Sequence, residues 1–593
     1  MRKLFTGIRG VFLVLILVLA VAALAGRYFR GAKSYRGPVV LEWSLGAIPE
    51  EASEDPFQVL SGRGSTLALR DYLDSLEAAG ADANVSGLLI NLGAAPVGVA
   101  TMQDLREAIL KFRAKKKFVY GYSESFGGLG NYYLASTFDR LFLLPSGEVA
   151  ITGIFADQQF IRGTLDKLGV QPHFEGRYEY KNVREYYMEK KFTPAHREAT
   201  DKLVGSLFNQ IVKGIAEGRG LSTDKVKDLI DHAPHFGPES VANHLVDELA
   251  YRDQAYAAAK KKAGAGAKLL FLSKYASNAK KQNDSGPRVA LIYGVGAITS
   301  GKSASDPLMG SSSMGADTVS AALRQAMDDP EVKAILFRVD SPGGSAIASD
   351  VIGREVQRAR QKGKPVIISM GAVAASGGYW VAMDADRIIA QPGTITGSIG
   401  VVSGKFIMAG LFEKLGLSFD AVKYGQNSSM YDSGRDFSPT ELERFRSSLD
   451  RIYETFTSRV AAGRKLPKEK VLQVAKGRVW SGEDAFGLGL VDELGGFNAA
   501  LDATKRILKL KPSDSIELKQ FPKRKSPLEA LAARFGSGES GDNSDEADVL
   551  TTPTDSYQAT LTRLRPFLLA LRAVGVLPGP QGELLAPELA LHY

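Results

Sequence analysis

The chain has 593 residues, of which 44% are hydrophobic and 24% charged, a composition typical of a folded protein with more than one hydrophobic core. Its formal net charge of +8 does not indicate a nucleic-acid-binding protein, because seven positive charges lie in residues 1–36 and the rest of the chain is nearly neutral. The absence of cysteine excludes a cysteine nucleophile, a cysteine-ligated zinc site and disulfide bonds.

The first 36 residues are expected to hold a membrane-spanning helix. An apolar run extends from 10 to 26, and its 17 residues are about the minimum length for a helix that crosses a bilayer. Arg9 and Arg27 flank this run, so the positive charges on both sides give little indication of orientation. The Ala-Leu-Ala sequence at 23–25 would also suit a signal peptidase, so a cleaved signal peptide is the alternative. In both cases we expect an exported or membrane-tethered protein.

The chain contains two copies of one domain. Residues 334–400 align without a gap with residues 87–153 at a step of 247 residues, so that Tyr379 falls on Tyr132. Short matches continue upstream and downstream of these segments at steps of 250 and 245 residues. Because solenoid repeats recur every ~20–50 residues, a step of this size indicates a duplicated domain.

Strands and helices are expected to alternate in both copies. The first copy is predicted to have strands at 38–48, 87–92 and 117–122 and helices at 67–79 and 102–113. The second copy is predicted to have strands at 289–293, 334–339 and 365–370 and helices at 316–327, 347–361 and from about 376. Long amphipathic helices are expected in matching places, at 197–216 and 440–462. This alternation is typical of an α/β fold in which helices cover parallel sheets.

The chain is predicted to consist of five segments. They are a membrane anchor or signal segment (1–36), a first domain (37–256), a connector rich in alanine, glycine and lysine (257–287), a second domain (288–520) and a C-terminal extension (521–593). The extension holds an acidic linker at 535–547 and one amphipathic helix at 556–574, which we expect to be a docking or oligomerisation segment.

Only the second copy carries a candidate nucleophile. Ser376 lies where a predicted buried strand meets a run of small residues, whereas the first copy has Leu129 at the same place. A serine at a helix start is often only an N-cap, but the free N–H groups and the dipole of a helix start also favour an alkoxide or an oxyanion. Gly377 and Gly378 follow and leave room for a substrate carbonyl close to the backbone.

A second glycine-rich turn is expected to face the same point. The Ser-Pro-Gly-Gly sequence at 341–344 follows the neighbouring strand, and its Gly343-Gly344 turn can direct an N–H group towards that of Gly377. Two converging N–H donors form an oxyanion hole, in which each donor is worth about 3–4 kcal/mol. Such a sequence alone is more often a tight turn, and its combination with Ser376 about 30 residues later is what indicates a catalytic site.

A serine nucleophile needs a base, and the second copy offers no histidine. None of the six histidines lies between residues 250 and 590, so a Ser-His-Asp triad within that copy is excluded. A lysine whose pKa is lowered by desolvation is the remaining base near neutral pH. Lys181 of the first copy, which lies among aromatic residues just after a predicted strand, is the best candidate; Lys190 and Lys191 are weaker ones in a charged stretch.

Three motifs together resemble the signal peptide peptidase A family in its long, two-domain form: SPGG at 341–344, AASGGYW at 374–380 and TGSIG at 396–400. The resemblance extends over about residues 38–510. It implies a membrane-bound serine protease built from tandem Clp-protease/crotonase-like domains. It also implies a role for each site residue: Ser376 as nucleophile, Lys181 as general base, Gly377 with Gly343 and Gly344 as oxyanion hole, and Ser398 as the residue that orients the lysine.

The same resemblance implies the surroundings of the enzyme. We expect a homotetramer in the inner cell membrane, anchored by a single N-terminal helix with its catalytic domains on the extracytoplasmic side. Its substrates would be cleaved signal peptides, degraded through an acyl-enzyme intermediate, and no cofactor, metal ion or nucleic acid is expected. The chain departs from the family pattern around the lysine, where two residues are added and Asn182 replaces a hydroxyl residue.

Three other functions fit parts of the sequence. Residues 296–303 match the phosphate-binding G-x-x-x-x-G-K-S pattern, but that pattern requires a helix directly after Lys302, and a loop is expected at 304–307. A crotonase-type acyl-CoA enzyme would share the sheet and the oxyanion hole, but it would require neither export nor Ser376. A non-catalytic membrane scaffold with two degenerate domains would not react with serine-directed probes.

Overall fold

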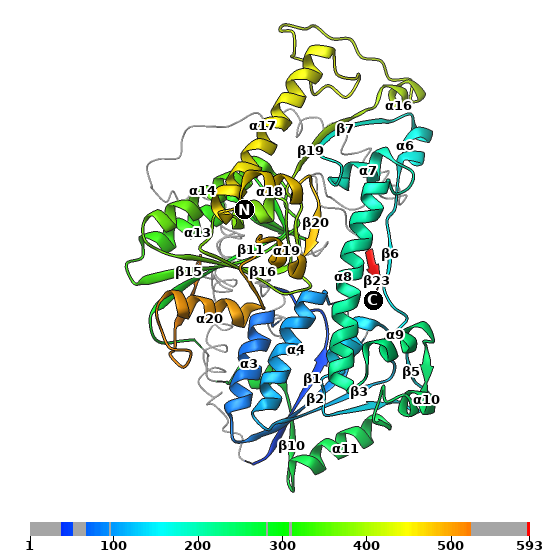
Figure 1. Cartoon of the computed structure of the whole chain (residues 1–593), viewed down its shortest axis with the longest axis vertical. Helices are drawn as coiled ribbons and strands as arrows, with labels where there is room; N and C mark the ends of the chain where they lie inside the picture. Colours follow the sequence, from blue (N-terminus) through cyan, green and yellow to red (C-terminus); the bar gives the residue numbers. More distant parts are fainter. Residues whose placement is uncertain are drawn as a thin grey trace, which may run out of the picture.

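The structure is a computed structural model, and it describes residues 37–50, 67–93, 97–279, 283–306, 311–522 and 590–592. It contains two large sheets covered by helices, and the sheet of the first half lies below that of the second half in Figure 1. The expected segments at 10–26, 535–547 and 556–574 lie outside the described residues. None of the helices within the described ranges has both the length and the apolar character needed to cross a membrane.

The first half forms a six-stranded parallel sheet. In spatial order its strands are β10 (Lys268–Phe271), β1 (Val39–Leu45), β2 (Val85–Leu92), β3 (Phe118–Ser123), β4 (Arg140–Leu143) and β9 (Glu248–Leu249). Its helices are α3 (Leu69–Ala81), α4 (Val99–Ala114), α5 (Leu129–Ala135), α6 (Arg162–Leu168), α7 (Glu185–Met188), α8 (Pro194–Arg219), α9 (Thr223–Asp231), α10 (Gly237–Ala242), α11 (Arg252–Ala263) and α12 (Leu272–Ala276), with a 3-10 turn at Asn182–Arg184.

The second half repeats this arrangement with an eight-stranded sheet. The main path runs β20 (Val479–Ser481), β18 (Ile395–Gly397), β16 (Val366–Ala375), β15 (Val332–Ser341), β11 (Arg288–Val295) and β22 (Glu517–Phe521), and β17 (Arg387–Ala390) joins β16 to β21 (Glu493–Leu494). All pairs are parallel except β18 with β20. The helices are α13 (Ala316–Asp328), α14 (Ala346–Gln361), α15 (Gly377–Ala382), α16 (Ala409–Lys414), α17 (Pro439–Arg464), α18 (Lys468–Val474), α19 (Gly482–Leu488) and α20 (Phe497–Ile507).

Four small sheets accompany the large ones in the described part of the chain. They pair β12 (Ala297–Thr299) with β14 (Ser311–Gly315) and β13 (Ala304–Asp306), β5 (Glu148–Val149) with β8 (His235–Phe236), β7 (Gln171–Arg177) with β19 (Val401–Ile407), and β6 (Phe155–Asp157) with β23 (Ala590–His592). The β7–β19 pair joins the two halves, because one strand comes from each.

The α/β alternation expected from the sequence is confirmed, and the predicted strands and helices lie within a few residues of the observed ones. β10 lies within the expected connector at 257–287, yet it pairs in parallel with β1 and forms an edge of the first sheet. The boundaries of the five segments stay a prediction.

Buried polar contacts recur at equivalent positions of the two halves. The Tyr132 hydroxyl donates to Leu245 O at 2.7 Å, and the Tyr379 hydroxyl donates to Leu490 O at 2.9 Å. Both tyrosines are fully buried, Tyr132 in α5 after β3 and Tyr379 in α15 after β16. The duplication therefore extends from the order of the elements to the hydrogen bonds that join them.

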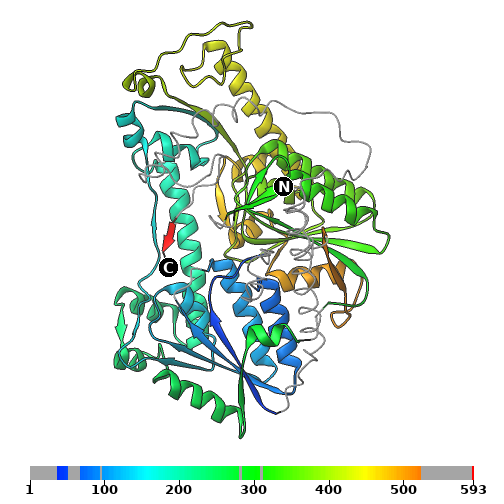
Figure 2. The same cartoon turned by 180° about the vertical axis from the view of Figure 1, so that it is seen from behind.

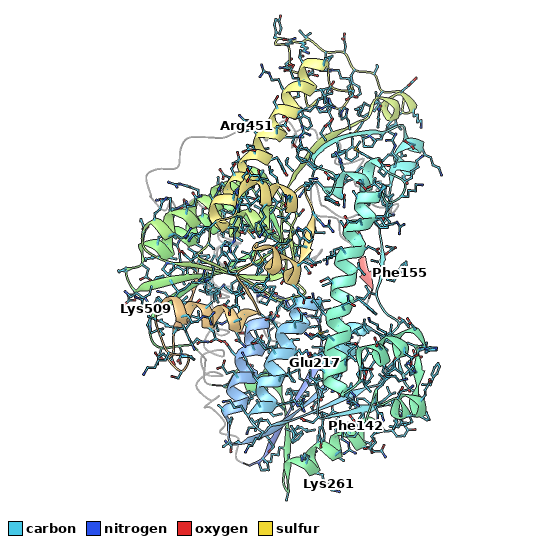
Figure 3. The ribbon with its side chains drawn as sticks, in the orientation of Figure 1. Phe142, Phe155, Glu217, Lys261, Arg451 and Lys509 are labelled. Atoms are coloured by element: carbon cyan, nitrogen blue, oxygen red, sulfur yellow. The ribbon has the colours of Figure 1, made fainter. Side chains whose placement is uncertain are left out.

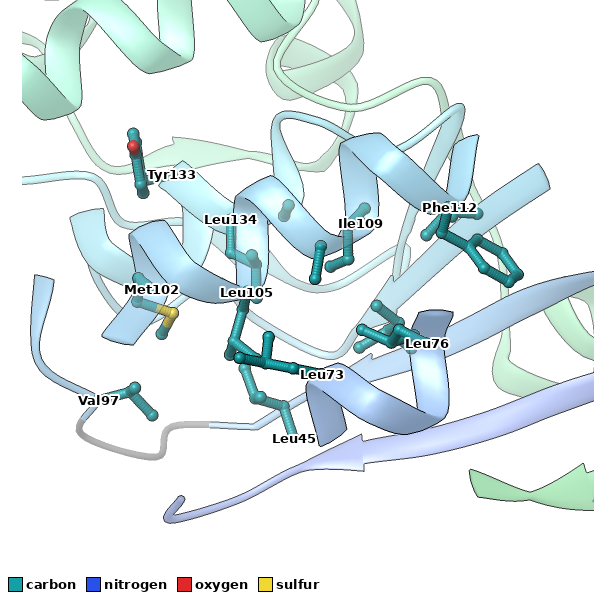
Figure 4. Packing of buried hydrophobic residues seen from close by; sticks show 14 of the residues in the cluster. Leu45, Leu73, Leu76, Val97, Met102, Leu105, Ile109, Phe112, Tyr133 and Leu134 are labelled. Carbon is teal, nitrogen blue, oxygen red and sulfur yellow. The ribbon is translucent and has the colours of Figure 1, made fainter. Parts of the chain in front are cut away.

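One hydrophobic core continues from the first half into the second. Figure 4 shows Leu73 and Leu76 of α3 near Leu105 and Ile109 of α4, and all four side chains are buried. Burial of each such side chain contributes about 1.5–3 kcal/mol. The same cluster includes Phe497 of α20 in the second half, so the two halves are not separate folding units in their packing.

A buried ion cluster also crosses the boundary between the halves. The guanidinium of Arg338 on β15 donates to both carboxylate oxygens of Glu50 at 2.9 Å and lies 3.4 Å from Asp104 Oδ2 on α4. Asp104 Oδ1 accepts hydrogen bonds from Gln391 Nε2 at 3.0 Å and from the Phe497 N–H at 3.1 Å. Burial raises the pKa of Asp104, and the adjacent guanidinium opposes this shift. The cluster fixes α4 of the first half against the sheet of the second.

Replacing Arg338 by methionine should destabilise the whole chain. Glu50 and Asp104 would stay buried without their cation, and breaking a buried ion pair costs about 3–5 kcal/mol. Urea denaturation followed by tryptophan fluorescence measures this loss in the free energy of unfolding. Lys362→Met breaks an exposed pair with Asp328 and should change the value by less than about 1 kcal/mol. Equal effects of the two substitutions would contradict the proposed importance of the cluster.

Candidate active site

Ser376 lies at a sharp bend between β16 and α15. Its φ of +54° and ψ of −115° put a non-glycine residue in a sparsely populated conformation, which costs about 1–3 kcal/mol. Backbone hydrogen bonds hold the bend: the Ser376 N–H donates to Gly397 O, and the Trp380 N–H donates to Ser376 O, both at 2.9 Å. The serine side chain makes no capping hydrogen bond to α15, so the simple N-cap role does not apply.

β7 carries the segment with Lys181 from the first half into the second. This strand pairs antiparallel with β19, from Val401 opposite Arg177 to Ile407 opposite Gln171. Figure 1 shows the two strands side by side at the upper end of the molecule, where α7 and α16 also lie. The pairing of β7 with β19 thus brings Lys181 of the first half to Ser376 at the end of β16. The two residues are 195 positions apart in the sequence.

The loop after β7 is held by the backbone of the second half. The N–H groups of Tyr178 and Tyr180 donate to Lys476 O at 3.1 and 3.2 Å. Gly477 comes next, and a Cβ at this position would lie 2.5 Å from the Cβ of Lys181. With φ at +86°, Gly477 also has a backbone conformation that favours glycine. These contacts fix the backbone from which the lysine side chain extends.

The Lys181 amine contacts two serines. Its Nζ lies 2.9 Å from Ser376 Oγ, 2.8 Å from Ser398 Oγ and 3.0 Å from Ser398 O. The lysine is only 4% exposed, so these oxygens replace the water that would otherwise surround an ammonium group. The structure therefore brings together three of the residues that the sequence singled out.

Burial lowers the pKa of Lys181 from 10.5 to about 7. Desolvation penalises the charged ammonium form, and no carboxylate contributes to the shift. Near neutral pH a substantial fraction of the amine is consequently uncharged. An uncharged amine within hydrogen-bond distance of a serine hydroxyl can accept its proton.

Ser398 is positioned by the segment that also holds the lysine loop. Its N–H donates to Arg478 O at 2.7 Å, and its own φ is +51°. The Arg478 guanidinium lies over the rings of Trp480 and Tyr180, with centroid distances of 4.3 and 4.9 Å, and it pairs with Glu198 of α8 at 2.7 Å. Arg478 thereby connects the segment of Ser398 with the segment of Lys181. No local sequence pattern predicted this role.

The Gly343-Gly344 turn lies directly against the start of α15. Gly343 has φ at +105°, and a Cβ there would lie 2.7 Å from Gly377 N and 2.8 Å from Ser376 Cβ. The Ile298 N–H donates to Gly343 O at 2.8 Å, which holds the turn on β12. Only glycine at 343 leaves open the space beside the Gly377 N–H and the serine.

The first half has no equivalent of this site. Leu129 replaces the serine at the start of α5 and is fully buried in the hydrophobic core. Pro96 and Val97 take the places of the two glycines of the turn, and Ser428 of the second half stands at the position equivalent to Lys181. The second half therefore supplies the serine and the glycine turn of the candidate site, and the first half supplies the lysine.

The weaker sequence candidates lie elsewhere. Lys190 is 67% exposed at the surface, where its amine pairs with Asp166 at 2.9 Å. The G-x-x-x-x-G-K-S segment does not open a helix: Lys302 and Ser303 lead into β13, which pairs antiparallel with β14. The prediction of a loop at 304–307 was therefore wrong for residues 304–306. They form a strand because the backbone of β14 pairs with them.

No group of three or more histidine, aspartate and glutamate side chains in the described ranges is arranged to hold a metal ion.

Comparisons with known proteins show a match to one peptidase family and to several proteases. The sequence pattern of Peptidase family S49 matches residues 111–266 and 358–511, once in each half. Protease 4 of Salmonella typhi is 31% identical over 531 residues, which cover 86% of this chain and 84% of that protein. The chloroplastic Serine protease SPPA of Arabidopsis thaliana is 29% identical over 490 residues, covering 81% and 72%. Protease 4 of Haemophilus influenzae is 30% identical over 463 residues, covering 75% and 74%.

Replacing Lys181 by methionine should stabilise the fold near neutral pH. The unfolded chain keeps the ordinary lysine pKa of 10.5, whereas the folded value is about 7, so between these pH values the unfolded chain binds more protons. This difference in pKa lowers the free energy of unfolding by at most about 5 kcal/mol at pH 7. The destabilisation becomes smaller as the pH rises towards 10.5.

Urea denaturation at pH 7 and pH 9.5 tests this expectation. The gain from Lys181→Met should be clearly larger at the lower pH, and the exposed Lys362→Met control should show no such dependence. A Lys181→Met chain that is less stable than the unmodified chain at both pH values would contradict the desolvation argument.

Proposed function

The chain belongs to peptidase family S49, and from this premise we propose that it is a serine endopeptidase with Ser376 as nucleophile and Lys181 as general base. The observation that carries the proposal is the 2.9 Å distance between Lys181 Nζ and Ser376 Oγ. The lowered pKa of the lysine suits the same role, because an amine must be uncharged at the working pH to accept a proton.

Acylation begins when the uncharged Lys181 amine accepts the Ser376 hydroxyl proton as Oγ attacks the scissile carbonyl carbon. The resulting oxyanion accepts hydrogen bonds from the Gly377 N–H and from the Gly343-Gly344 turn. The Lys181 ammonium then gives its proton to the departing amine. The C–N bond breaks, and an ester joins the N-terminal part of the substrate to Ser376.

Deacylation repeats these steps with water. Lys181 accepts a proton from the water as its oxygen attacks the ester carbonyl, and the same N–H groups stabilise the second oxyanion. The ammonium returns the proton to Ser376 Oγ as the ester bond breaks, which releases a carboxylate product. Ser398 accepts hydrogen bonds from the lysine through its hydroxyl and carbonyl and so orients the amine throughout the cycle.

The substrates that we propose are cleaved signal peptides. The apolar segment at 10–26 would anchor the chain in the inner cell membrane with its catalytic halves on the extracytoplasmic side. The resemblance noted in the sequence also implies tandem crotonase-like domains and a homotetramer, and we retain both as part of the proposal. Protease 4 of Salmonella typhi and the other relatives, similar over most of their length, support a common activity.

Ser376→Ala and Lys181→Ala should each lower kcat/KM by about 10⁴-fold or more, because nucleophile and base act as one unit. A fluorogenic peptide assay measures the loss, and labelling by a fluorophosphonate followed by peptide mapping should identify Ser376. Two buried residues serve as matched controls: Ser320→Ala on α13 and Lys405→Ala, whose amine donates to Met430 O and Asp432 O. Both controls should keep most of the activity.

An active Lys181→Ala enzyme would refute the lysine as base. Turnover of acyl-CoA thioesters that survives Ser376→Ala would instead favour a crotonase-type enzyme, and the absence of any labelled serine would favour a scaffold.

The activity should rise with pH through the pKa of Lys181. Below about 7 the amine is protonated, so kcat/KM should fall about tenfold for each further pH unit, and above that value it should level off. Initial rates with one peptide between pH 5 and pH 9 give the profile. A profile that stays flat between pH 6 and pH 9 would rule out a base with this pKa.

A further inference from the structure

The second half contains a charged pocket that the proposed peptidase activity does not use. The pocket has a volume of about 360 Å³ and lies where α14 and α17 end and where β17 begins. Its charged lining residues are Arg360, Asp386, Arg387, Arg464, Lys465 and Asp492. Four cations thus stand against two carboxylates, which leaves an excess of two positive charges.

The pocket and the candidate active site lie at opposite ends of the strands of one sheet. Arg387 begins β17 opposite Ile367 near the start of β16, whereas Ser376 follows the end of β16, and the two strands are parallel. Figures 1 and 2 show α14 and α20 on the side of the molecule away from α8, and Figure 3 labels Lys509, just after α20, at this outer side. A ligand in the pocket would therefore not compete with a peptide at Ser376.

Both carboxylates of the pocket already have partners. Asp386 accepts a hydrogen bond from Arg360 Nε at 2.9 Å and another from the first backbone N–H of β16 at 2.8 Å. Asp492 pairs with the Arg464 guanidinium and accepts a hydrogen bond from a backbone N–H of β17 at 2.7 Å. Each carboxylate thus holds one arginine and one strand in place.

The other cationic groups of the pocket have hydrogen-bond donors to spare. Arg387 and Lys465 are exposed, and neither forms an ion pair with any of the residues that the structure describes. The side chain of Arg464 is only 5% exposed, and its Nε donates no hydrogen bond within the described ranges. The pocket therefore offers more donors than the described chain can satisfy.

The first half repeats the two ion pairs of this network. Arg113 Nε donates to Asp139 at 2.9 Å, 247 residues before the equivalent pair, and Arg219 donates to Asp247 at 3.0 Å, 245 residues before its equivalent. Arg219 Nε also donates to His244 O at 2.8 Å, a hydrogen bond that its equivalent lacks among the described residues of the second half. The pairs belong to the common frame, so the differences around them are what is particular to the second half.

One difference is the loss of a carboxylate partner. Arg140, the equivalent of Arg387, pairs with Glu248 in the first half. Glu493 stands at the position equivalent to Glu248, but it pairs with Arg506 of α20 instead. The first half thus neutralises the arginine that the second half leaves available.

The other difference is an added cation. Lys465 ends α17 where Gly220 ends α8, and both have the left-handed backbone conformation, with φ of +54° and +66°. Glycine adopts this conformation freely, whereas it costs other residues free energy. A lysine at a position that favours glycine indicates a use for its charge.

We propose that this pocket of the second half binds a phosphate group. The guanidinium of Arg387 and the amine of Lys465 donate to the phosphate oxygens, and Arg464 adds positive charge to the same pocket. The excess of two positive charges matches the charge of about −2 that a phosphate monoester carries near neutral pH. Free phosphate and a phospholipid headgroup both offer this chemistry. The proposal does not involve Ser376 or Lys181, so it and the proposed peptidase activity can fail separately.

Isothermal titration calorimetry of the full-length chain in detergent, with inorganic phosphate at constant ionic strength, tests the proposal. The unmodified chain should bind one phosphate with a Kd below about 1 mM. Lys465→Gly and Arg387→Gln should each raise the Kd by about tenfold or more, because each removes a charged donor. Lys465→Gly restores the residue of the first half in a conformation that suits glycine, so the variant should fold normally.

Arg140→Gln is the matched control, because it removes the equivalent arginine of the first half, and it should change the Kd by less than about twofold. Titration with glycerol 3-phosphate distinguishes the two sources: tighter binding than that of inorganic phosphate favours a phospholipid headgroup, and weaker binding favours the free anion. The absence of phosphate binding below about 1 mM would overturn the inference. A Kd that Lys465→Gly and Arg387→Gln leave unchanged, or that Arg140→Gln raises equally, would overturn it as well.

Discussion

The site depends on an amine that is buried without a neutralising acid. Desolvation alone lowers the pKa of Lys181 to about 7, and its contacts are hydroxyl and carbonyl oxygens of Ser376 and Ser398. A carboxylate at the same distance would stabilise the ammonium form, so that less of the proposed base would be uncharged near neutral pH. Two features of the surrounding structure bury the amine. The strand β7 brings Lys181 across the boundary between the halves, and Gly477 has no side chain that would clash with the Lys181 backbone.

Duplication followed by divergence explains how one chain combines a stable frame with a strained site. Tyr132 and Tyr379 make the same buried hydrogen bond in both halves, so the frame does not require the proposed catalytic residues. The differences lie at a few positions, such as Leu129 in place of Ser376. Where the first half has a buried leucine in the core, the second half has a bend with positive φ and a serine hydroxyl 2.9 Å from the Lys181 amine.

The sequence predicted the parts of the molecule that local patterns encode. Apolar periodicity located the strands and helices, small residues and glycines located Ser376 and the turn before it, and the lack of histidine directed attention to Lys181. Contacts between distant segments carry no such signal. The pair of Arg338 with Glu50 spans 288 residues, and Arg478 contacts Tyr180 and Glu198 of the other half in addition to its local partners. The strand at 304–306 was also missed, although its partner residues, 311–313, lie close to it in the sequence.

The split origin of the site has a consequence for biosynthesis. In the proposed mechanism the base is made early in translation, but the nucleophile and the residues that hold the lysine loop, Lys476 and Gly477, leave the ribosome much later. In that mechanism the nascent chain therefore stays inert until both halves have been made.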